Sequence, residues 1–342
     1  MANPSFTELS ADWPEKPTRD RENLIVAAVR AGNYLPLRWV PLVATYNGMK
    51  ATFQVMADTL KLGNDEDAVR VNVTAEGQQR IAHLLGAYLP TARLVEMAYE
   101  QGVRITPCLQ PPDARMGYTS RMVEHSHAVD AKVAGQTGLV AGNAGKHWTL
   151  SNHIIDQHLD GGPMAENFGW FRRQIRPFKP YQTPGHRHNT FHTDYSQICW
   201  LIGNQVDVDG TLLDLEEVLT SPSLAGLAHH EPLRRVTIPI SSSVELDAAE
   251  TSAPTLEAPP DAPAADAVAG WRTLRLGMNG SDVQAWQQCL LDAGHDLGAS
   301  GADGDFGART HSATVAWQVA HGLPADGVVG LKTKALVATS RT

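Results

Sequence analysis

The C-terminal part of the chain contains one short pattern twice. Residues 303–313 read Asp-Gly-Asp-Phe-Gly-Ala-Arg-Thr-His-Ser-Ala, and residues 326–336 read Asp-Gly-Val-Val-Gly-Leu-Lys-Thr-Lys-Ala-Leu. In both copies the Asp-Gly pair predicts a turn, because glycine adopts the positive φ that such turns require. The threonine after the second glycine predicts the start of a short helix. The repeat therefore predicts a small helical module built from two similar units.

Upstream of the first copy, the residues follow the period of a helix. Val283, Trp286, Gln287 and Leu290 occupy positions i, i+3, i+4 and i+7, which places them on one face of a helix. A Trp-Gln pair recurs at residues 317–318, after the first Asp-Gly turn. The helix pattern therefore belongs to the same repeated module.

Four motifs in this region carry a resemblance to a known family. They are Leu-x-x-Gly-x-x-Gly-x-x-Val-x-x-Trp-Gln-x-x-Leu at 274–290, Asp-Gly-x-Phe-Gly-x-x-Thr at 303–310, Trp-Gln-x-x-x-Gly-Leu at 317–323 and Asp-Gly-x-Val-Gly-x-x-Thr at 326–333. The stretch from about residue 271 to 336 resembles the type 1 peptidoglycan-binding domain family. That family often has Leu and Phe where this chain has Trp286 and Trp317, and the change keeps both positions apolar.

The resemblance implies a small all-α module of three helices that binds bacterial cell wall and is usually non-catalytic. Peptidoglycan is therefore the partner expected for residues 271–342. Most apolar motif positions are expected to be packing residues, so binding would fall to polar side chains near the repeat turns. The candidate substrate-binding residues are Asp305, Arg309 and Gln318.

Length and charge limit the other function classes. A chain of 342 residues exceeds what one hydrophobic core usually serves, so two domains are expected. The net charge of −9, without a basic cluster, argues against nucleic acid as a partner and against attraction to an anionic membrane. No apolar run approaches the length of a membrane-spanning helix. The three cysteines are too few for a disulfide framework, and a monomer is expected.

Residues 243–270 have the composition of a linker. They contain four prolines, many alanines and several acidic residues, but no Lys or Arg. Proline and like charge both extend a chain, so an acidic tether is expected here. The predicted division is an N-terminal domain over residues 1–242, the linker over 243–270 and the wall-binding domain over 271–342.

The first twenty residues bear on localisation. They are polar and show neither the basic segment nor the apolar run of a secretory signal. A wall-binding module nevertheless predicts a location in the cell wall, in the periplasm or outside the cell. The expectation is synthesis in the cytoplasm followed by export without a Sec signal, as for phage lytic enzymes and injection-machine cargo, unless a signal has been removed from this sequence.

The N-terminal region mixes strands and helices without a regular β–α–β order, which predicts an α+β domain with a mixed or antiparallel sheet. Asn47-Gly48 predicts a hairpin between strands at 39–45 and 49–56. Thr18, Thr74 and Thr91 predict the starts of three helices. The other predicted elements are strands at 103–106, 197–202 and 206–208 and helices at 122–133 and 213–219.

The densest polar cluster is Gly-His-Arg-His-Asn-Thr-Phe-His-Thr-Asp-Tyr-Ser-Gln at residues 185–197. Side chains alternate along an extended chain, so His186 and His188 are predicted to share one face, and His192 and Asp194 to do the same after a turn. Two such pairs could offer imidazole and carboxylate ligands to Zn²⁺, whose bound water would attack an amide bond. This metal hypothesis assigns His186, His188, His192 and Asp194, although their spacing matches no named zinc motif.

The same segment also permits a mechanism without metal. Ser196 would be the nucleophile, His188 or His192 its base and Asp194 the orienting carboxylate. Lys146, in a glycine-rich turn upstream, would contribute a cation to an oxyanion site. A third interpretation makes the segment a polar surface loop without a catalytic role.

The expected function of the N-terminal domain follows from the module beside it. Wall-binding modules of this type are usually fused to enzymes that cut the wall, so the prediction is a hydrolase of an amide or peptide bond in peptidoglycan or another envelope polymer. The alternative is a non-enzymatic adaptor, or a cargo scaffold of an injection system or phage. An enzyme should gather His188, His192 and Asp194 in a cleft beside Lys146 or Cys108, whereas an adaptor would leave them scattered.

Overall fold

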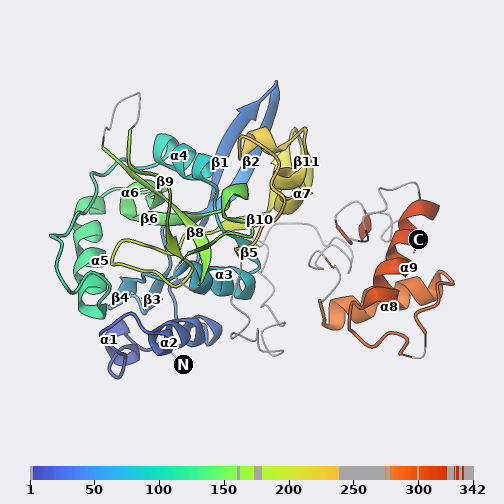
Figure 1. Cartoon of the computed structure of the whole chain (residues 1–342), viewed down its shortest axis with the longest axis horizontal. Helices are drawn as coiled ribbons and strands as arrows, with labels where there is room; N and C mark the ends of the chain where they lie inside the picture. The colour runs from blue at the N-terminus through green and yellow to red at the C-terminus, as the bar shows by residue number, and fades with distance from the viewer. Residues whose placement is uncertain are drawn as a thin grey trace. The chain divides into compact units, whose positions relative to one another are not determined.

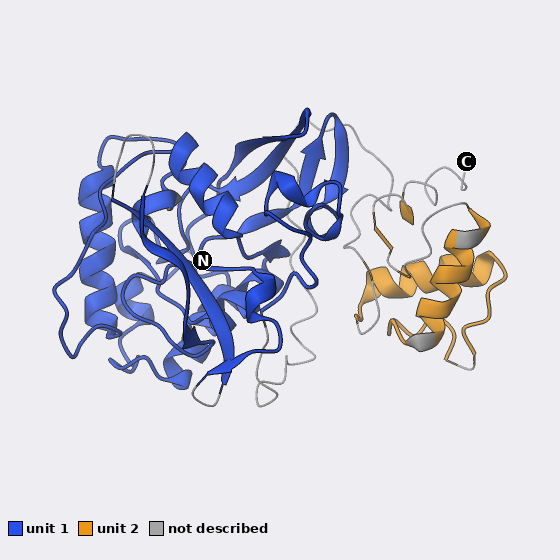
Figure 2. Ribbon diagram, turned by 45° about the horizontal axis from the view of Figure 1, so that its top comes forward, with its two compact units in different colours: residues 1–245 blue, residues 246–342 orange. Residues whose placement is uncertain are grey.

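The computed structural model divides the chain into two compact units, residues 1–245 and residues 246–342 (Figure 2). The predicted linker at 243–270 lies outside the described residues. The structure describes residues 3–159, 162–172, 179–238, 274, 278–298, 300–321, 327, 329–330 and 333–334.

The first sheet of unit 1 is built around the predicted hairpin. β1 (Trp39–Tyr46) and β2 (Met49–Met56) pair antiparallel along their whole length, so this prediction is confirmed. Asn47 and Gly48 have φ of 49° and 81°, the left-handed conformation that an Asn-Gly hairpin turn requires. The sheet runs in the order β1-β2-β10-β11, with β5 also pairing with β10. The added strands are β5 (Ala87–Tyr88), β10 (Ile202–Val208) and β11 (Thr211–Asp214).

Three helices of unit 1 begin at the threonines that the sequence indicates. The side chain of Thr18 accepts a hydrogen bond from the backbone N–H three residues later, and Thr74 and Thr91 do the same. Each contact satisfies one of the N–H groups that a helix leaves unpaired at its first turn. The helices are α2 (Arg19–Arg30), α3 (Ala75–Leu84) and α4 (Ala92–Gln101).

The second sheet of unit 1 carries the candidate site. Its longest strands, β8 and β9, run side by side (Figure 1), and β6 and β7 also pair with β8. The register between β8 and β9 shifts on either side of Asn167, which marks irregularities in this pair. The strands are β6 (Lys146–Thr149), β7 (His158–Leu159), β8 (Gly162–Phe171) and β9 (Pro180–Asn189).

One large hydrophobic core joins these two sheets, a third sheet of two short strands and several of the helices. Its largest members include the fully buried Trp148 and Trp200, whose indole N–H groups donate to the carbonyls of Val73 and Met56. All named strand pairs are antiparallel, in agreement with an α+β domain. The remaining elements are α1 (Phe6–Leu9), β3 (Lys61–Gly63), β4 (Ala68–Arg70), α5 (Thr119–Val133), α6 (Ala141–Ala144), η1 (Asn152–Ile154), α7 (Leu215–Thr220) and η2 (Ala225–Leu227).

Several predicted strands differ from the structure. Residues 103–106 form no strand, because they pair with no neighbouring strand. They make single hydrogen bonds to separate segments instead: Val103 N–H donates to Leu139 O, and Lys132 Nζ donates to Thr106 O. In place of the two strands predicted at 197–202 and 206–208, the structure has one strand, β10, in which Gly203 lies opposite Ala87 of β5. A Cβ on Gly203 would lie 3.2 Å from the carbonyl oxygen of Gln54, so glycine permits close approach here.

The repeated motif of unit 2 is explained by two buried glutamines. Gln287 Oε1 accepts from Gly304 N–H, while its Nε2 donates to Asp303 Oδ1, Asp305 O and Thr310 Oγ1. In the second copy, Gln318 Oε1 accepts from Gly327 N–H and Nε2 donates to Thr333 Oγ1. The glutamine of each Trp-Gln pair therefore bonds to the glycine and to the threonine of the repeat unit that follows it. The helices here are α8 (Ser281–Asp292) and α9 (Ala308–Ala320).

Unit 2 has its own small core. The rings of Trp286 and Trp317 meet edge to face with centroids 5.3 Å apart, and Trp286 Nε1 donates to Thr314 Oγ1. The described part of this unit contains α8, α9 and two isolated β-bridges, and Thr333 and Lys334 also have helical conformation. The predicted third helix would fall largely outside the described residues. Within the part of the chain that the structure describes, no helix is long and apolar enough to cross a membrane.

Candidate functional site

Part of the predicted cluster assembles where the chain leaves β9. The rings of His188 and His192 stack with centroids 3.7 Å apart and planes 9° apart. Both rings lie edge to face with Trp148. Lys146 of β6 pairs with Asp194 at 3.0 Å between Nζ and Oδ2. The fold therefore places these predicted residues on one region of the second sheet.

The electrostatics of this region keep both imidazoles neutral at pH 7. Burial lowers the pKa of His188, the Lys146 ammonium lowers it further, and Asp194 opposes them. Burial lowers the pKa of His192 to about 4, with repulsion from His188 adding to the effect. For Asp194, burial alone would raise the pKa, but Lys146 and the hydrogen bonds from Ser196 hold it below its ordinary value. The pair Lys146–Asp194 is therefore charged beside two neutral rings.

Ser196 occupies a different position from that of a triad nucleophile. Its side chain is fully buried, and both its hydroxyl and its backbone N–H donate to Asp194 Oδ1. A triad serine would instead donate to a histidine. Gln197 Oε1 accepts from Asp194 N–H at 2.6 Å, which closes the turn. A nucleophilic role for Ser196 would require it to leave this contact.

The prediction that His186 and His188 share one face is wrong, because a bulge separates them. Ala165 of β8 pairs with His188 and Asn167 pairs with Gly185, so Glu166 faces two residues of β9. The extra residue reverses the alternation of side chains. His186 Nε2 accordingly contacts Glu166 Oε2 at 2.7 Å on the other face. The four predicted zinc ligands His186, His188, His192 and Asp194 are thus not gathered around one point.

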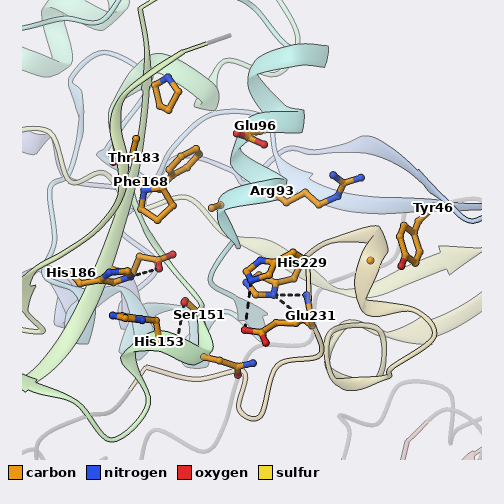
Figure 3. Close-up of a pocket in the computed structure, with 17 residues that line it drawn as sticks. Tyr46, Arg93, Glu96, Ser151, His153, Phe168, Thr183, His186, His229 and Glu231 are labelled. Atoms are coloured by element: carbon orange, nitrogen blue, oxygen red, sulfur yellow. Dashed lines mark hydrogen bonds and ion pairs between the residues drawn. The ribbon is translucent and has the colours of Figure 1, made fainter. Parts of the chain in front are cut away.

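The face that carries His186 opens into a pocket of about 1050 Å³. Figure 3 shows His153 and His186 on one side of this pocket and His229 with Glu231 on the other. Phe168 of β8 and Arg93 and Glu96 of α4 also line it. A large concave site with converging polar groups is the usual form of a ligand or substrate site.

The first wall of the pocket is a hydrogen-bonded chain. Thr149 Oγ1 donates to Glu166 Oε1 at 2.7 Å, and the other carboxylate oxygen contacts His186 Nε2. The Glu166 side chain is 5% exposed and that of His186 27% exposed, so the carboxylate is fixed and the imidazole reaches the pocket. The ring of His153 stacks on His186 with centroids 3.8 Å apart. This arrangement can hold an imidazole in one orientation and accept or donate a proton.

The second wall is the short segment after η2. Burial lowers the pKa of His229, although the backbone bond to Glu231 acts in the opposite direction. His229, His230 and Glu231 each offer one ligand atom, and these atoms lie within 4.8 Å of one another. Among the residues that the structure describes, this is the one group of three or more His, Cys, Asp or Glu side chains that could hold a metal ion.

The candidate binding residues of unit 2 separate into two kinds. Gln318 is 1% exposed and its amide is used inside the repeat, so its side chain is not offered to a ligand. Asp305 and Arg309 are exposed near the first Asp-Gly turn. These two therefore remain candidates for contact with peptidoglycan.

Sequence reasoning missed Glu166, His153 and the His229–Glu231 segment as members of one site. Glu166 is an isolated carboxylate among apolar strand residues, and the pair at 229–230 lies in a stretch without secondary-structure pattern. The available signal was His-His-Glu itself, three potential metal ligands in a row. Only the fold brings this segment opposite β8 and β9.

Comparison with known proteins identifies the C-terminal module. Residues 279–337 match the family described as "Putative peptidoglycan binding domain", which confirms the resemblance expected from the repeat. Over 61 residues the chain is 46% identical to a "Probable N-acetylmuramoyl-L-alanine amidase" of Bacillus licheniformis. No solved structure matches the chain.

Both matches cover less than a fifth of this chain. The match to the amidase covers 18% of this chain and 17% of that protein, so the chain spans less than a fifth of the relative's length. Unit 1 comprises residues 1–245, and a match of 61 residues leaves most of it without a counterpart. The comparisons therefore support peptidoglycan as a partner and a location at the cell wall.

Proposed function

We propose that this protein is a peptidoglycan hydrolase that cleaves an amide or peptide bond, with its active site in the pocket of unit 1 and its wall-binding module in unit 2. The observation that supports this most strongly is the contact between the buried Glu166 carboxylate and the partly exposed His186 imidazole, at the wall of a pocket of about 1050 Å³. The amidase match and the wall-binding module indicate the substrate class. The identity of the bond is part of the proposal.

In the proposed reaction His186 is the general base. Its Nε2–H donates to Glu166, so Nδ1 carries the lone pair that takes a proton from a water molecule in the pocket. The water oxygen then forms a bond to the carbonyl carbon, the carbon–nitrogen bond breaks, and the proton on Nδ1 passes to the departing amine. Glu166 is a positioning residue that stabilises the imidazolium, and Thr149 fixes the carboxylate.

The test is release of soluble fragments from isolated peptidoglycan sacculi by the full-length protein. His186→Ala and Glu166→Gln should each lower release by about 10²-fold or more, the usual scale for loss of general base catalysis. His188→Ala changes a histidine on the opposite face of the same sheet and should retain release if the pocket holds the active site. Co-sedimentation with sacculi is measured for every variant, and it should be unchanged because unit 2 is intact.

The His188–His192–Asp194–Lys146 cluster is the second candidate for the active site. What favours it is the pair of neutral imidazoles beside a buried ion pair. If His188→Ala abolishes release while His186→Ala retains it, the chemistry belongs to this cluster, with Ser196 or a bound ion as the source of the nucleophile. If the wild type co-sediments without release, unit 1 is an adaptor or cargo scaffold rather than a hydrolase.

A further inference from the structure

We propose that His229, His230 and Glu231 form a binding site for one divalent transition-metal ion of the zinc class, at the wall of the pocket opposite His186. Two imidazoles and one carboxylate are a ligand set that zinc accepts, and three protein ligands leave further coordination positions open. The ligand atoms lie within 4.8 Å of one another. That spacing suits side chains that close on a single ion with small rotations.

The ring of His229 is already held as a ligand would be. Its Nδ1 lies 2.8 Å from the carbonyl oxygen of Glu231 and 3.3 Å from the Glu231 backbone nitrogen, and the shorter of the two contacts favours a proton on Nδ1. Nε2 then carries the lone pair that binds a metal. Metal-bound histidines commonly donate their second ring N–H to a backbone carbonyl in this way. The residue is 4% exposed, so the packing around it fixes the ring.

The backbone that carries the three ligands is anchored on both sides. Thr91 Oγ1 at the start of α4 donates to Ala228 O, and His229 N–H donates to Ala225 O. Leu233 N–H donates to Leu219 O at the end of α7. A fixed backbone lowers the entropy that ligands lose on binding an ion.

The other two ligands face solvent. The side chains of His230 and Glu231 are 79% and 47% exposed, with His230 Nε2 and Glu231 Oε1 3.7 Å apart. An ion can therefore reach the site from bulk water, and replacing His230 leaves no buried hole. Because His229 and Glu231 line the same pocket as His186, an ion held there would face the groups of the proposed active site.

The experiment uses the full-length protein and adds Zn²⁺ under isothermal titration calorimetry. The wild type should bind one ion per chain. His230→Ala and Glu231→Gln should each weaken binding by about tenfold or more, and Co²⁺ in the wild type should show the visible absorption of a nitrogen- and oxygen-ligated site that both variants lose. His127→Ala, an exposed histidine on α5, is the matched control and should bind as the wild type does.

The site is overturned if His230→Ala and Glu231→Gln bind Zn²⁺ as the wild type does, if the wild type binds none, or if His186→Ala alone removes binding. The site does not need the hydrolase proposal, although the ion's role in activating water would rest on it. One bound Zn²⁺ without fragment release from sacculi would leave the site standing and remove the hydrolase. If His230→Ala still releases fragments and binds Zn²⁺ as the wild type does, the metal site is removed and the hydrolase proposal stands.

Discussion

The buried imidazole of His125 links the stability of unit 1 to pH. His125 is 1% exposed on α5, and its ring packs edge to face on Tyr195 with ring centroids 5.2 Å apart. Its Nε2 has no hydrogen-bond partner among the described residues. Burial, helped by repulsion from Arg70, lowers the pKa of His125 to about 3. The unfolded chain takes up a proton near pH 6.5. The stability that this residue contributes is therefore complete above about pH 6.5 and is lost as the pH falls toward about 3.

We expect His125→Phe to flatten this dependence. Between about pH 6.5 and 3 the free energy of unfolding should fall less steeply than in the wild type, by up to about 1.4 kcal/mol per pH unit. Urea unfolding at a series of pH values measures the slope. His127→Phe, exposed on the same helix, should keep the wild-type slope. Parallel curves for wild type and His125→Phe would contradict the assignment.

Single residues also decide which polar groups are free to bind. Gln318 is predicted from the sequence as a binding residue, but its amide holds Gly327 and Thr333. Gln287 repeats the arrangement in the first copy. An unpaired buried amide costs about 1–3 kcal/mol, so a repeat glutamine that left its turn to bind a ligand would destabilise the module. Asp305 and Arg309 are exposed, so contact with a ligand would leave no buried group of theirs unpaired.

At the scale of elements, one threonine links the start of α4 to the segment 225–231, which carries the three proposed metal ligands. Thr91 Oγ1 accepts from Leu94 N–H at the helix start and donates to Ala228 O, and the residue is fully buried. Thr18 makes the same cap contact at the start of α2 but is exposed, and its hydroxyl donates no hydrogen bond to another described residue. The two threonines therefore separate the effect of a helix cap from the effect of the link to residues 225–231.

We expect Thr91→Ala to destabilise unit 1 more than Thr18→Ala does. Loss of either cap should cost about 1 kcal/mol, and Thr91→Ala also leaves the buried Ala228 carbonyl without its donor, for about 1–3 kcal/mol more. Denaturant unfolding gives the two values, and amide exchange at residues 225–231 should rise only in Thr91→Ala. Equal losses for both variants would mean that the Ala228 contact contributes nothing.

At the scale of the whole molecule, the family match and the pocket lie in different units. Unit 2 carries the match to the peptidoglycan-binding family, and the pocket lies in unit 1. A chain of residues 1–245 should therefore lose co-sedimentation with sacculi, whereas the full-length His186→Ala variant should keep it. A pull-down with purified sacculi measures both. Retained binding by residues 1–245 would place a wall contact in unit 1 as well.

The sequence alone determined the features that depend on neighbours along the chain. Asn47-Gly48 predicted a hairpin and three threonines predicted helix starts, because turns and caps are set by a few consecutive residues. The repeated Trp-Gln and Asp-Gly motifs identified the wall-binding module, since its two halves use the same local contacts. The prediction of a strand at 103–106 was wrong, because a strand needs a second strand to pair with and this segment is beside none.

The tertiary structure alone decided which polar residues meet. A bulge between β8 and β9 moved His186 away from His188 and onto Glu166, a change that alternation along an extended strand does not foresee. His229 comes 43 positions after His186 in the chain. The fold nevertheless places the two histidines on opposite walls of one pocket. Periodicity reports the face of a single strand, whereas a site joins faces of separate elements, and only packing in three dimensions selects them.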